Sequence, residues 1–577
     1  MNGVVRRCPI PVSSKLLREK LDRMKGVAPL NISVQQRIVV DYDVPIQIGP
    51  TLNNRFIRFG KYAQLISGPI TGSPTTNTHS LLVIGNTSEQ IPQPTSTTPR
   101  IEGCTAGDTI LVVDRPVTAN KWYFLYDANR METHRTNSPP LTRGIGGELV
   151  FVKTYAYDEV ELRDPLTQSY GGSGSDVVLV NVSDRVCENI SIRGGKFIGK
   201  RQAGMRAHID CGMVAGLKIQ GCTFDTGWVA AVAAYGCRKV QIRNCTADKF
   251  SQYNGYATGY TFLFDRSVVG TFDSLLIRDT RYGVSVSRGS ADWLVSGVLG
   301  EKCRDGAIDV HGGDCYNGTF QNIVAQVDAV DGSTTSKPTL RIGNSDWRRG
   351  ASSVTLKDSY AFQVVLDSAI RDSTIENVCG VRAVVQGAGQ DPNVGAPAGK
   401  FDNVEFLSCS FDTGTSGVDA AFKCIAGPLP APQYLWFQEL KLTDCTITQS
   451  SSAFLPAFSC EAVSTGSSCF FDSCTVKNLD SAATSSGKLM YLGAPKPAYL
   501  SGSGDPIEVT WASTTALMPN RDPFYPAVGL GSVSTGVSSV TFFDDTTGAT
   551  PNRRGPTLGS LNDLSEDDFV NVTYEVI

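Results

Sequence analysis

The stretch Ile242-Arg-Asn-Cys-Thr-Ala247 decides the fold, because it is one of ten copies of a six-residue pattern. Each copy begins with a large apolar residue, has a small or polar turn residue third and a cysteine or other small residue fourth, and usually ends on an apolar residue. Successive copies begin 19 to 43 residues apart, as expected for one coil plus a variable loop. The copies begin at Ile192, Ile219, Ile242, Ile277, Phe320, Leu356, Ile375, Phe406, Leu442 and Phe471.

A strand, a short bend and a second strand cannot bury an apolar face alone, so the repeats must stack on one another, about 4.8 Å per layer. The fold class predicted is therefore all-β, a right-handed parallel β-helix. Stacking also aligns the cysteines that occupy the fourth position of five copies, as an inward ladder of small apolar side chains. They are Cys222, Cys245, Cys409, Cys445 and Cys474.

The cysteines are predicted to be reduced. The chain has 16 of them in 577 residues, a far smaller share than in disulfide scaffolds, and none lies in a Cys-x-x-Cys pair. No Cys and His cluster has zinc spacing, so no metal and no cofactor is expected. We expect buried free thiols in a protein made in a reducing cytoplasm.

The regions on either side of the repeat differ in composition. Residues 1–30 carry an amphipathic stripe of Leu17, Leu21 and Met24 and are predicted to form a short helix ending at Gly26, an anchor peptide separate from the core. Residues 31–165 form a β-rich cap and the start of the β-helix, with a long loop or inserted arm at 73–100. Residues 166–495 form the β-helix, and 496–577 a separate all-β domain for trimerisation or carbohydrate binding.

Charge and hydropathy exclude several classes of protein. The net charge is -4, which argues against binding to nucleic acid or an anionic membrane. No apolar run is long enough to span a bilayer, and the N-terminus lacks the apolar segment of an export signal. Nucleotide-binding, zinc-protease and nucleophile-elbow motifs are absent.

The candidate site lies in three consecutive coils, in which Ile308-Asp-Val-His311 directs Ile308 and Val310 to the core. Asp309 and His311 then share the outer face, about 7 Å apart along an exposed strand. They are either a surface pair that supports the following Gly-Gly turn or catalytic groups with Asp265 of an earlier coil. Neighbouring residues suited to sugars are Tyr260, Arg281, Tyr282, Arg288, Trp293 and Glu301.

Other constellations rank lower. His208 and Asp210 have the same outward spacing several coils earlier, and Trp122, Trp347 and Trp436 are predicted to pack or to anchor loops.

The anchor peptide, the irregular β-helix and the turn Ile308-Asp-Val-His-Gly-Gly313 together resemble the tailspike proteins of tailed bacteriophages that degrade capsular polysaccharides. The resemblance covers residues 30–490 as architecture and 255–315 as motif. It implies a homotrimer in the virion tail that acts on the bacterial surface and attaches to another tail protein through residues 1–30.

Two chemistries and one binding role remain open. Endo-glycosidic hydrolysis needs two carboxylates, and Asp309 with Asp265, two layers apart, would fit the inverting range, with Glu301, Asp305 and Asp314 as substitutes. A polysaccharide lyase would use His311 or Tyr282 as base and Arg281 or Arg288 to stabilise the uronate. A receptor-binding fibre would bind without turnover. A cell-wall or pectin enzyme of the same fold is disfavoured by the lack of an export signal.

Overall fold

The structure is a computed structural model of the 577-residue chain. It describes residues 30–34, 37–41, 45–50, 53–60, 62–70, 78–85, 93–129, 131–133, 142–144, 146–172, 174–250, 259–311, 313, 315–326, 338–343, 351–367, 370–386, 400–414, 416, 418–425, 436–437, 439–450, 457–460, 468–478, 490–492, 508–512, 515–517, 528–530, 540–543 and 572–575. All regular structure in these ranges is β-strand, which confirms the all-β prediction. The helix expected within residues 1–30 lies outside them, and so do Asp314 and Trp347. None of the described residues forms a helix that could cross a membrane.

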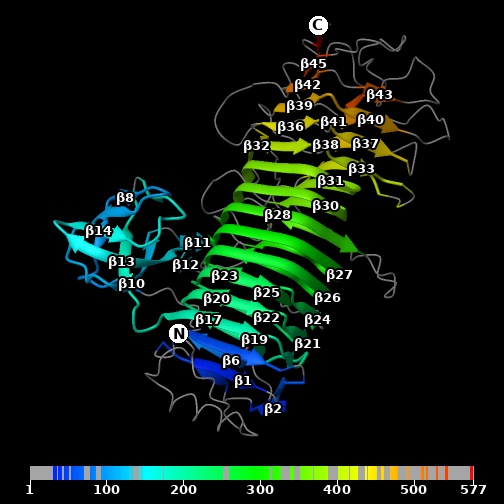
Figure 1. Cartoon of the computed structure of the whole chain (residues 1–577). Helices are drawn as coiled ribbons and strands as arrows, with labels where there is room; N and C mark the ends of the chain where they lie inside the picture. Colours follow the sequence, from blue (N-terminus) through cyan, green and yellow to red (C-terminus); the bar gives the residue numbers. More distant parts are fainter. Residues whose placement is uncertain are drawn as a thin grey trace. The chain divides into compact units, whose positions relative to one another are not determined.

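Two compact units make up the chain, with nearly all residues up to Pro338 in the first and Thr339–Ile577 in the second. Most of the first unit is a stack of coils, and each coil contributes one strand to each of three parallel sheets (Figure 1). Sheet one contains β1 (Leu30–Val34), β4 (Arg55–Phe59), β17 (Cys187–Arg193), β20 (Val214–Gln220) and β23 (Arg238–Arg243). Sheet two contains β2 (Arg37–Val40), β5 (Gln64–Ser67), β18 (Lys196–Ile198), β21 (Thr223–Asp225) and β24 (Thr246–Phe250). Sheet three contains β3 (Ile46–Ile48), β6 (His79–Gly85), β19 (Met205–Gly212), β22 (Ala230–Tyr235) and β25 (Tyr260–Asp265).

The next two coils are drawn as single long strands, β26 (Val268–Ser287) and β27 (Ala291–His311), and β28 (Cys315–Gln326) follows. The beginning, middle and end of β26 pair with sheets one, two and three, because its bends do not interrupt the ladder. The predicted parallel β-helix is thereby confirmed, and its core consists of columns of apolar residues in register. One such column runs through Ile192, Ile219, Ile242 and Phe272.

The third position of the predicted repeat is a bend with positive φ in every copy. Asn244 has φ 51° and Asp444 has φ 52°, values that favour Gly, Asn and Asp. The copy predicted to begin at Ile277 is out of register, since Ile277 pairs with Ala247 in sheet two, and Phe272 aligns with Ile242. The error arose because Asp279, at the next corner, also has positive φ, so both corners carry the same turn chemistry.

The expected ladder of cysteines is present. Fourteen cysteines are described, all of them free and all buried except Cys379. The Cys474 Sγ donates to the backbone carbonyl of Leu442 at 3.3 Å, and the Cys445 Sγ donates to that of Phe406 at the same distance. The small buried thiols thus fill the corner between two sheets and also satisfy carbonyls of the preceding coil.

An antiparallel domain is inserted between the second and third coils. Strand β6 of the second coil pairs directly with β19 of the third, although the chain makes a whole sheet between them. That sheet has the order β7-β16-β10-β13-β14-β9, accompanied by the short pairs β11–β12 and β8–β15. The strands are β7 (Arg100–Ile101), β8 (Gly103–Cys104), β9 (Ile110–Val112), β10 (Lys121–Asp127), β11 (Met131–Thr133), β12 (Thr142–Gly144), β13 (Glu148–Ala156), β14 (Glu159–Leu162), β15 (Tyr170–Gly171) and β16 (Val177–Asn181).

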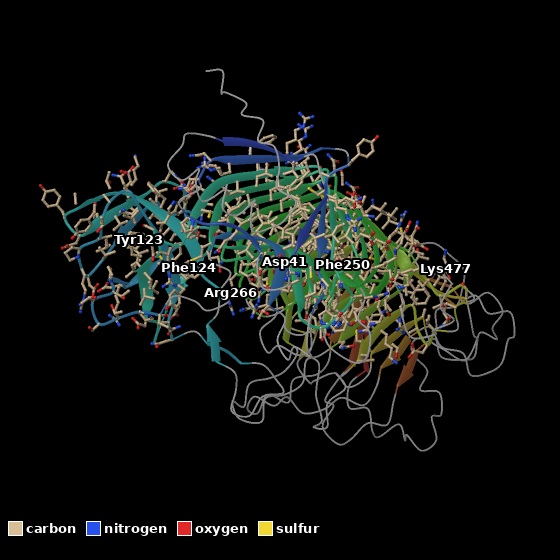
Figure 2. All side chains as sticks on the ribbon, turned by 90° about the horizontal axis from the view of Figure 1, so that it is seen from below. Asp41, Tyr123, Phe124, Phe250, Arg266 and Lys477 are labelled. Atoms are coloured by element: carbon tan, nitrogen blue, oxygen red, sulfur yellow. The ribbon has the colours of Figure 1, made fainter. Side chains whose placement is uncertain are left out.

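A buried ion pair and an apolar cluster tie the inserted domain to the coils. Figure 2 shows Tyr123 and Phe124 within the insert and Phe250 among the coils. Phe124 and its neighbours on β10 pack against Met213 and Ala215 of the coils. Glu148, fully buried, accepts a 2.8 Å bond from Arg238 of β23 and also bonds from backbone N–H groups of the insert.

The second unit repeats the coil arrangement with its own apolar column, Leu356, Ile375, Phe406, Leu442, Phe471 and Trp511. Strands β42, β43 and β44 pair in parallel with β39, β40 and β41, so the stack continues past the break expected near residue 496, and the separate C-terminal domain stays a prediction. The strands are β29 (Thr339–Ile342), β30 (Ala351–Asp367), β31 (Ile370–Gln386), β32 (Lys400–Leu407), β33 (Ser410–Asp412), β34 (Phe422–Ile425), β35 (Trp436–Phe437), β36 (Leu440–Thr443), β37 (Thr446–Gln449), β38 (Phe458–Cys460), β39 (Ser468–Asp472), β40 (Thr475–Asn478), β41 (Met490–Leu492), β42 (Glu508–Ala512), β43 (Thr515–Leu517), β44 (Val528–Leu530), β45 (Val540–Phe543) and β46 (Val572–Glu575).

Candidate functional site

Asp309 lies on the outer face of sheet three, where the period of two placed it, with Ile308 and Val310 buried on the inner face. The expectation that this face is exposed is wrong, because Asp309 is 0% exposed. Its Oδ2 accepts a bond of 3.2 Å from Ser285 Oγ, the residue opposite it on β26. Strands of sheet three are apolar on both faces, as in Ala230–Tyr235, so both faces are buried.

Asp265 lies in a different column from Asp309. The register places Asp265 opposite Ser287, and Ser287 opposite His311. Two coils along the axis and two residues along the strand separate the Cα atoms of Asp265 and Asp309 by about 12 Å. The two aspartates are therefore not stacked as expected. The side chain of His311 lies outside the described part of the structure.

Asp265 is also fully buried, and it forms an ion pair with Arg288. The Arg288 Nε donates to Asp265 Oδ1 at 2.9 Å, and the Arg288 Nη2 contacts Oδ2. Both side chains are shielded from solvent, at 9% exposure for Arg288 and 0% for Asp265. The arginine expected to bind substrate therefore neutralises a buried carboxylate.

The predicted tyrosines and Arg281 do come together, at the corner between sheets two and three. The rings of Tyr260 and Tyr282 stack with centroids 5.4 Å apart, and the guanidinium of Arg281 lies 4.7 Å from the Tyr282 centroid. A register shift between Thr280 and Tyr282 turns Arg281 towards Asp305, and the Arg281 Nε donates to its Oδ2 at 2.6 Å. Tyr260 is partly exposed, whereas Tyr282 is buried.

Asp305 has two arginine partners. Burial raises the pKa of the Asp305 carboxyl, but hydrogen bonds and positive charge from Arg304 and Arg281 outweigh burial and hold that pKa below its usual range. Asp305 is thus an ionised group at neutral pH.

The remaining predicted residues lie elsewhere. Trp293 points into the core and is 3% exposed, and a side chain at Gly318 would collide with its indole, so it is a packing residue. Glu301 lies on the outer face of sheet two and accepts a 2.5 Å bond from Arg278.

His208 is a core residue and not the outward partner of Asp210. Its ring stacks on Phe224 at 5.8 Å and meets the edge of Phe250 at 5.1 Å. Burial lowers the pKa of His208 to about 3, so the imidazole is neutral. Asp210 is buried as well and pairs with Arg206 at 2.7 Å.

The sequence reasoning missed a pair of carboxylates on the outer face of sheet two. Asp225 and Asp248 are register partners on adjacent coils, so their backbones are about 4.8 Å apart. Their side chains are 23% and 42% exposed. The signal was available, since each aspartate directly follows the last residue of its repeat copy.

Basic residues surround this pair. Lys196 Nζ lies 2.8 Å from Asp225, and Lys249 Nζ lies 3.9 Å from Asp225 and 3.4 Å from Asp248. Burial raises the pKa of Asp225, but hydrogen bonds from Lys196 and Thr226 and the charges of Lys196 and Lys249 bring it below its usual value. No cluster of metal-ligating side chains occurs within the ranges that the structure describes.

Comparison with known proteins gives a fold but no family. No family model and no curated protein matches the chain. The crystal structure of the tailspike protein gp49 from Pseudomonas phage LKA1 matches with 14% identity and a TM-score of 0.51, over 91% of this chain and 77% of that chain. The chain has the fold of a phage tailspike.

Two further tailspikes are similar to a lesser degree. The tailspike gp61 of Pseudomonas phage phi297 has 12% identity and a TM-score of 0.45, over 91% of this chain and 76% of that one. The Gp54 tailspike of Acinetobacter baumannii bacteriophage AP22, in complex with a capsular saccharide, has 11% identity and a TM-score of 0.41, over 92% and 76%. At such identities the likeness concerns the fold alone.

Proposed function

We propose that this protein is a phage tailspike that binds a bacterial surface polysaccharide and cleaves it by endo-glycosidic hydrolysis. The tailspike fold supports a place for this protein in a phage tail. The observation that carries the reaction is the stacked pair Asp225 and Asp248, which solvent reaches on an otherwise regular sheet.

The spacing of the pair suits a retaining mechanism, in which the carboxyl groups are about 5–5.5 Å apart. Asp225, kept ionised by its lysines, attacks the anomeric carbon and forms a glycosyl ester as the glycosidic bond breaks. Asp248 protonates the departing oxygen and then takes a proton from the water that releases the sugar. The basic side chains beside them bind hydroxyl or acidic groups of the chain.

Asp309 and Asp265, the first candidates, do not serve this proposal as well. Both are fully buried in the single chain, and Arg288 already occupies Asp265. Their polar contacts hold coils together within sheet three.

A second candidate reaction is β-elimination at the corner cluster. Arg281 lies 6.0 Å from the ring of partly exposed Tyr260 and within 3.5 Å of the Tyr282 hydroxyl. A nearby guanidinium favours the tyrosinate that removes a proton next to a uronate carboxylate, and it stabilises the charge that then develops on that carboxylate.

The test incubates the protein with a panel of purified capsular polysaccharides and measures product masses. Asp225→Asn and Asp248→Asn should each slow cleavage about 10²- to 10⁴-fold while the protein stays folded. Asp225→Asn should melt at a slightly lower temperature, because it loses the ion pair with Lys196. The control Asp184→Asn alters an 82% exposed aspartate and should cleave normally.

Hydrolysed ends carry one added water, whereas elimination gives an unsaturated end that absorbs in the ultraviolet. If the products are unsaturated, and if Tyr260→Phe abolishes them while Asp225→Asn does not, the reaction is elimination and the proposed hydrolysis is wrong. A polysaccharide that binds but is never shortened would make the protein a receptor-binding fibre.

We also propose that the protein is a homotrimer in the virion tail, joined to another tail protein through residues 1–30. Light scattering should give a mass near three chains. A truncation starting near Leu30 should cleave soluble polysaccharide but fail to join the particle, and an inactive or insoluble truncation would place these residues in the fold.

A further inference from the structure

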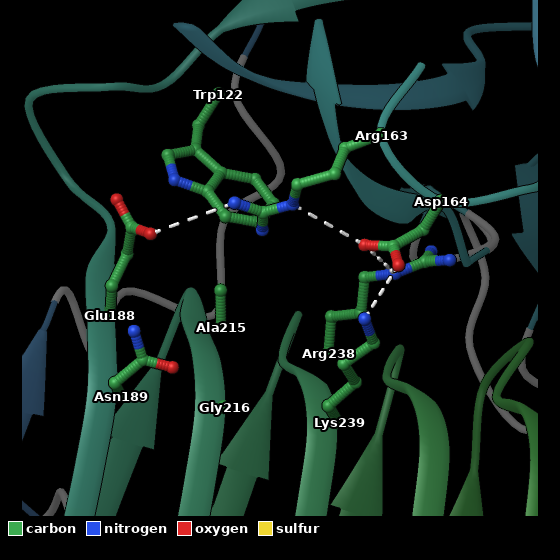
Figure 3. A pocket seen from close by; sticks show the side chains of 9 residues that line it. All are labelled: Trp122, Arg163, Asp164, Glu188, Asn189, Ala215, Gly216, Arg238 and Lys239. Atoms are coloured by element: carbon green, nitrogen blue, oxygen red, sulfur yellow. Dashed lines mark hydrogen bonds and ion pairs between the residues drawn. The ribbon is translucent and has the colours of Figure 1, made fainter. Parts of the chain in front are cut away.

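A small pocket lies where the inserted domain meets the coils (Figure 3). Its volume is about 180 Å³, room for about six water molecules, which suits one sugar residue or a small ion better than an oligosaccharide. Its floor is bare because Gly216 has φ +85°, and a Cβ there would lie 2.9 Å from Asn189 Oδ1. The lining consists of Trp122, Arg163, Asp164, Glu188, Asn189, Ala215, Gly216, Arg238 and Lys239.

Hydrogen-bond donors without acceptors converge on this pocket. Trp122 is 4% exposed, and its Nε1 has no hydrogen-bond partner among the described residues. The Nε of Arg238, which is 3% exposed, also makes no hydrogen bond in the part of the chain that the structure describes, although Asp164 Oδ2 lies 3.9 Å from it. Buried donors are nearly always satisfied in folded proteins, so a partner for these two is expected.

Arg163 adds a third set of donors. Its guanidinium lies 4.6 Å from the Trp122 ring and 4.5 Å from the Phe151 ring, so aromatic faces hold it in position. The nearest carboxylate oxygens, of Asp164 and Glu188, are 3.6 Å and 3.9 Å away, beyond hydrogen-bond length. Its planar N–H groups thus take part in two long ion pairs but donate no side-chain hydrogen bond among the described residues.

The charges and acceptors of the lining indicate what the ligand carries. Three cationic side chains and two carboxylates, Asp164 and Glu188, line the pocket. Lys239 pairs with Asp164 at 2.6 Å and Arg238 is bonded to the buried Glu148 at 2.8 Å, so Arg163 is the cation whose carboxylate contacts are all longer than a hydrogen bond. Glu188 lies at the end of the pocket that the Trp122 nitrogen faces (Figure 3), and its acceptors suit hydroxyl groups. A ligand that satisfies both ends has an oxyanion and several hydroxyls.

We propose that this pocket binds one acidic sugar residue, with its carboxylate on Arg163 and Arg238 and its hydroxyls between Trp122 and Glu188. The site lies on a different face of the coil from sheet two's carboxylate pair, since its floor belongs to sheet one. This proposal rests on the proposed function in one respect, because a bound polysaccharide would supply the acidic sugar. It would hold the polymer without taking part in cleavage.

Calorimetric titration of the full-length protein with glucuronate, glucose and inorganic phosphate tests the proposal. Glucuronate should bind, and the other two should bind at least about tenfold more weakly. Trp122→Phe and Arg163→Met should each weaken glucuronate binding about tenfold or more, because each removes a donor to the ligand. Raised salt should also weaken it.

The matched control is Arg115→Met, which removes an arginine of similar exposure in the same domain, 3.5 Å from its carboxylate partner. It should bind glucuronate normally, and circular dichroism should give it and Arg163→Met the wild-type melting temperature. Trp122→Phe should melt at a somewhat lower temperature, because Trp122 belongs to a buried apolar cluster, but it should remain folded at the temperature of the titration. Equal affinity for phosphate and glucuronate, or undiminished binding by Arg163→Met, would overturn the assignment. Binding of glucuronate by a protein that cleaves no polysaccharide would leave this site standing while refuting the proposed hydrolysis.

Discussion

At the scale of the residue, the depth of a polar side chain in this protein decides its chemistry. His208 and Asp248 both lie on strands of the same coil stack, yet aromatic rings enclose His208 whereas Asp248 meets solvent. An enclosed imidazole stays neutral, because the charged form would lose its hydration. The buried polar residues of sheet three, such as Asp265, therefore stabilise the coils, and the exposed ones of sheet two, such as Asp248, remain available to a ligand.

His208 should make the protein less stable as the pH falls. Its pKa of about 3 in the folded state lies below that of an unfolded histidine, so below pH 6.5 only the unfolded chain takes up the proton. At pH 4.5 this should cost about 2 to 3 kcal/mol. His208→Gln should lose this part of the pH dependence, which denaturant unfolding at pH 7 and 4.5 measures in both proteins. Identical pH profiles would contradict a neutral, buried His208.

At the scale of the element, the bend at the third repeat position sets where each coil turns. Residues there have φ near +50°, which Asn and Asp tolerate and β-branched residues do not. Because the same conformation recurs at the other corner, in Asp279, the turn chemistry predicts bends without saying which sheets they join.

Asn244→Val should destabilise the protein by about 1–2 kcal/mol, since valine is strained at φ 51°. Asn244→Gly should be within about 0.5 kcal/mol of wild type. Arg243→Val, at the exposed neighbouring position, is the control and should also be near neutral. Urea unfolding measures all three, and an equal loss in Arg243→Val would mean that exposure of valine, not backbone conformation, is responsible.

The stacked repeat and its inward cysteines were predictable from the sequence because both depend on local pattern. The packing of Trp293 in the core and the burial of Asp309 were not predictable, since both depend on what packs over a strand from distant parts of the chain. Alternation correctly separated Ile308 from Asp309 but could not reveal that the outer face is covered. The pair Asp225 and Asp248 was predictable in principle, since each aspartate directly follows the last residue of its repeat copy and the copies stack in register.

At the scale of the whole molecule, the coils depend on buried thiols that never form cross-links. Among the described cysteines Cys379 is the exposed one, and burial raises the pKa of others, such as Cys237 and Cys303, to about 12. Burial and a raised pKa both suppress the reaction of a cysteine with thiol reagents.

Thiol titration of the native protein should therefore give one rapid group that Cys379→Ala removes, in addition to any from Cys8 and Cys460. Titration after denaturation without reductant should give most of the 16 cysteines. Mainly oxidised cysteines under those conditions would show that the ladder is cross-linked. Cys104→Ala, at a buried position, should leave the rapid group unchanged.

The inserted domain has a consequence for the order in which the protein is made. Arg55 of the second coil pairs with Ile190 of the third, so the ribosome must synthesise the whole insert before the second coil gains its neighbour. The two N-terminal coils leave the ribosome as an exposed sheet edge, which invites pairing with another chain. Rapid folding of the insert would shorten that interval by bringing its two ends together, so slowing its folding should reduce the yield of assembled protein even where every coil residue is unchanged.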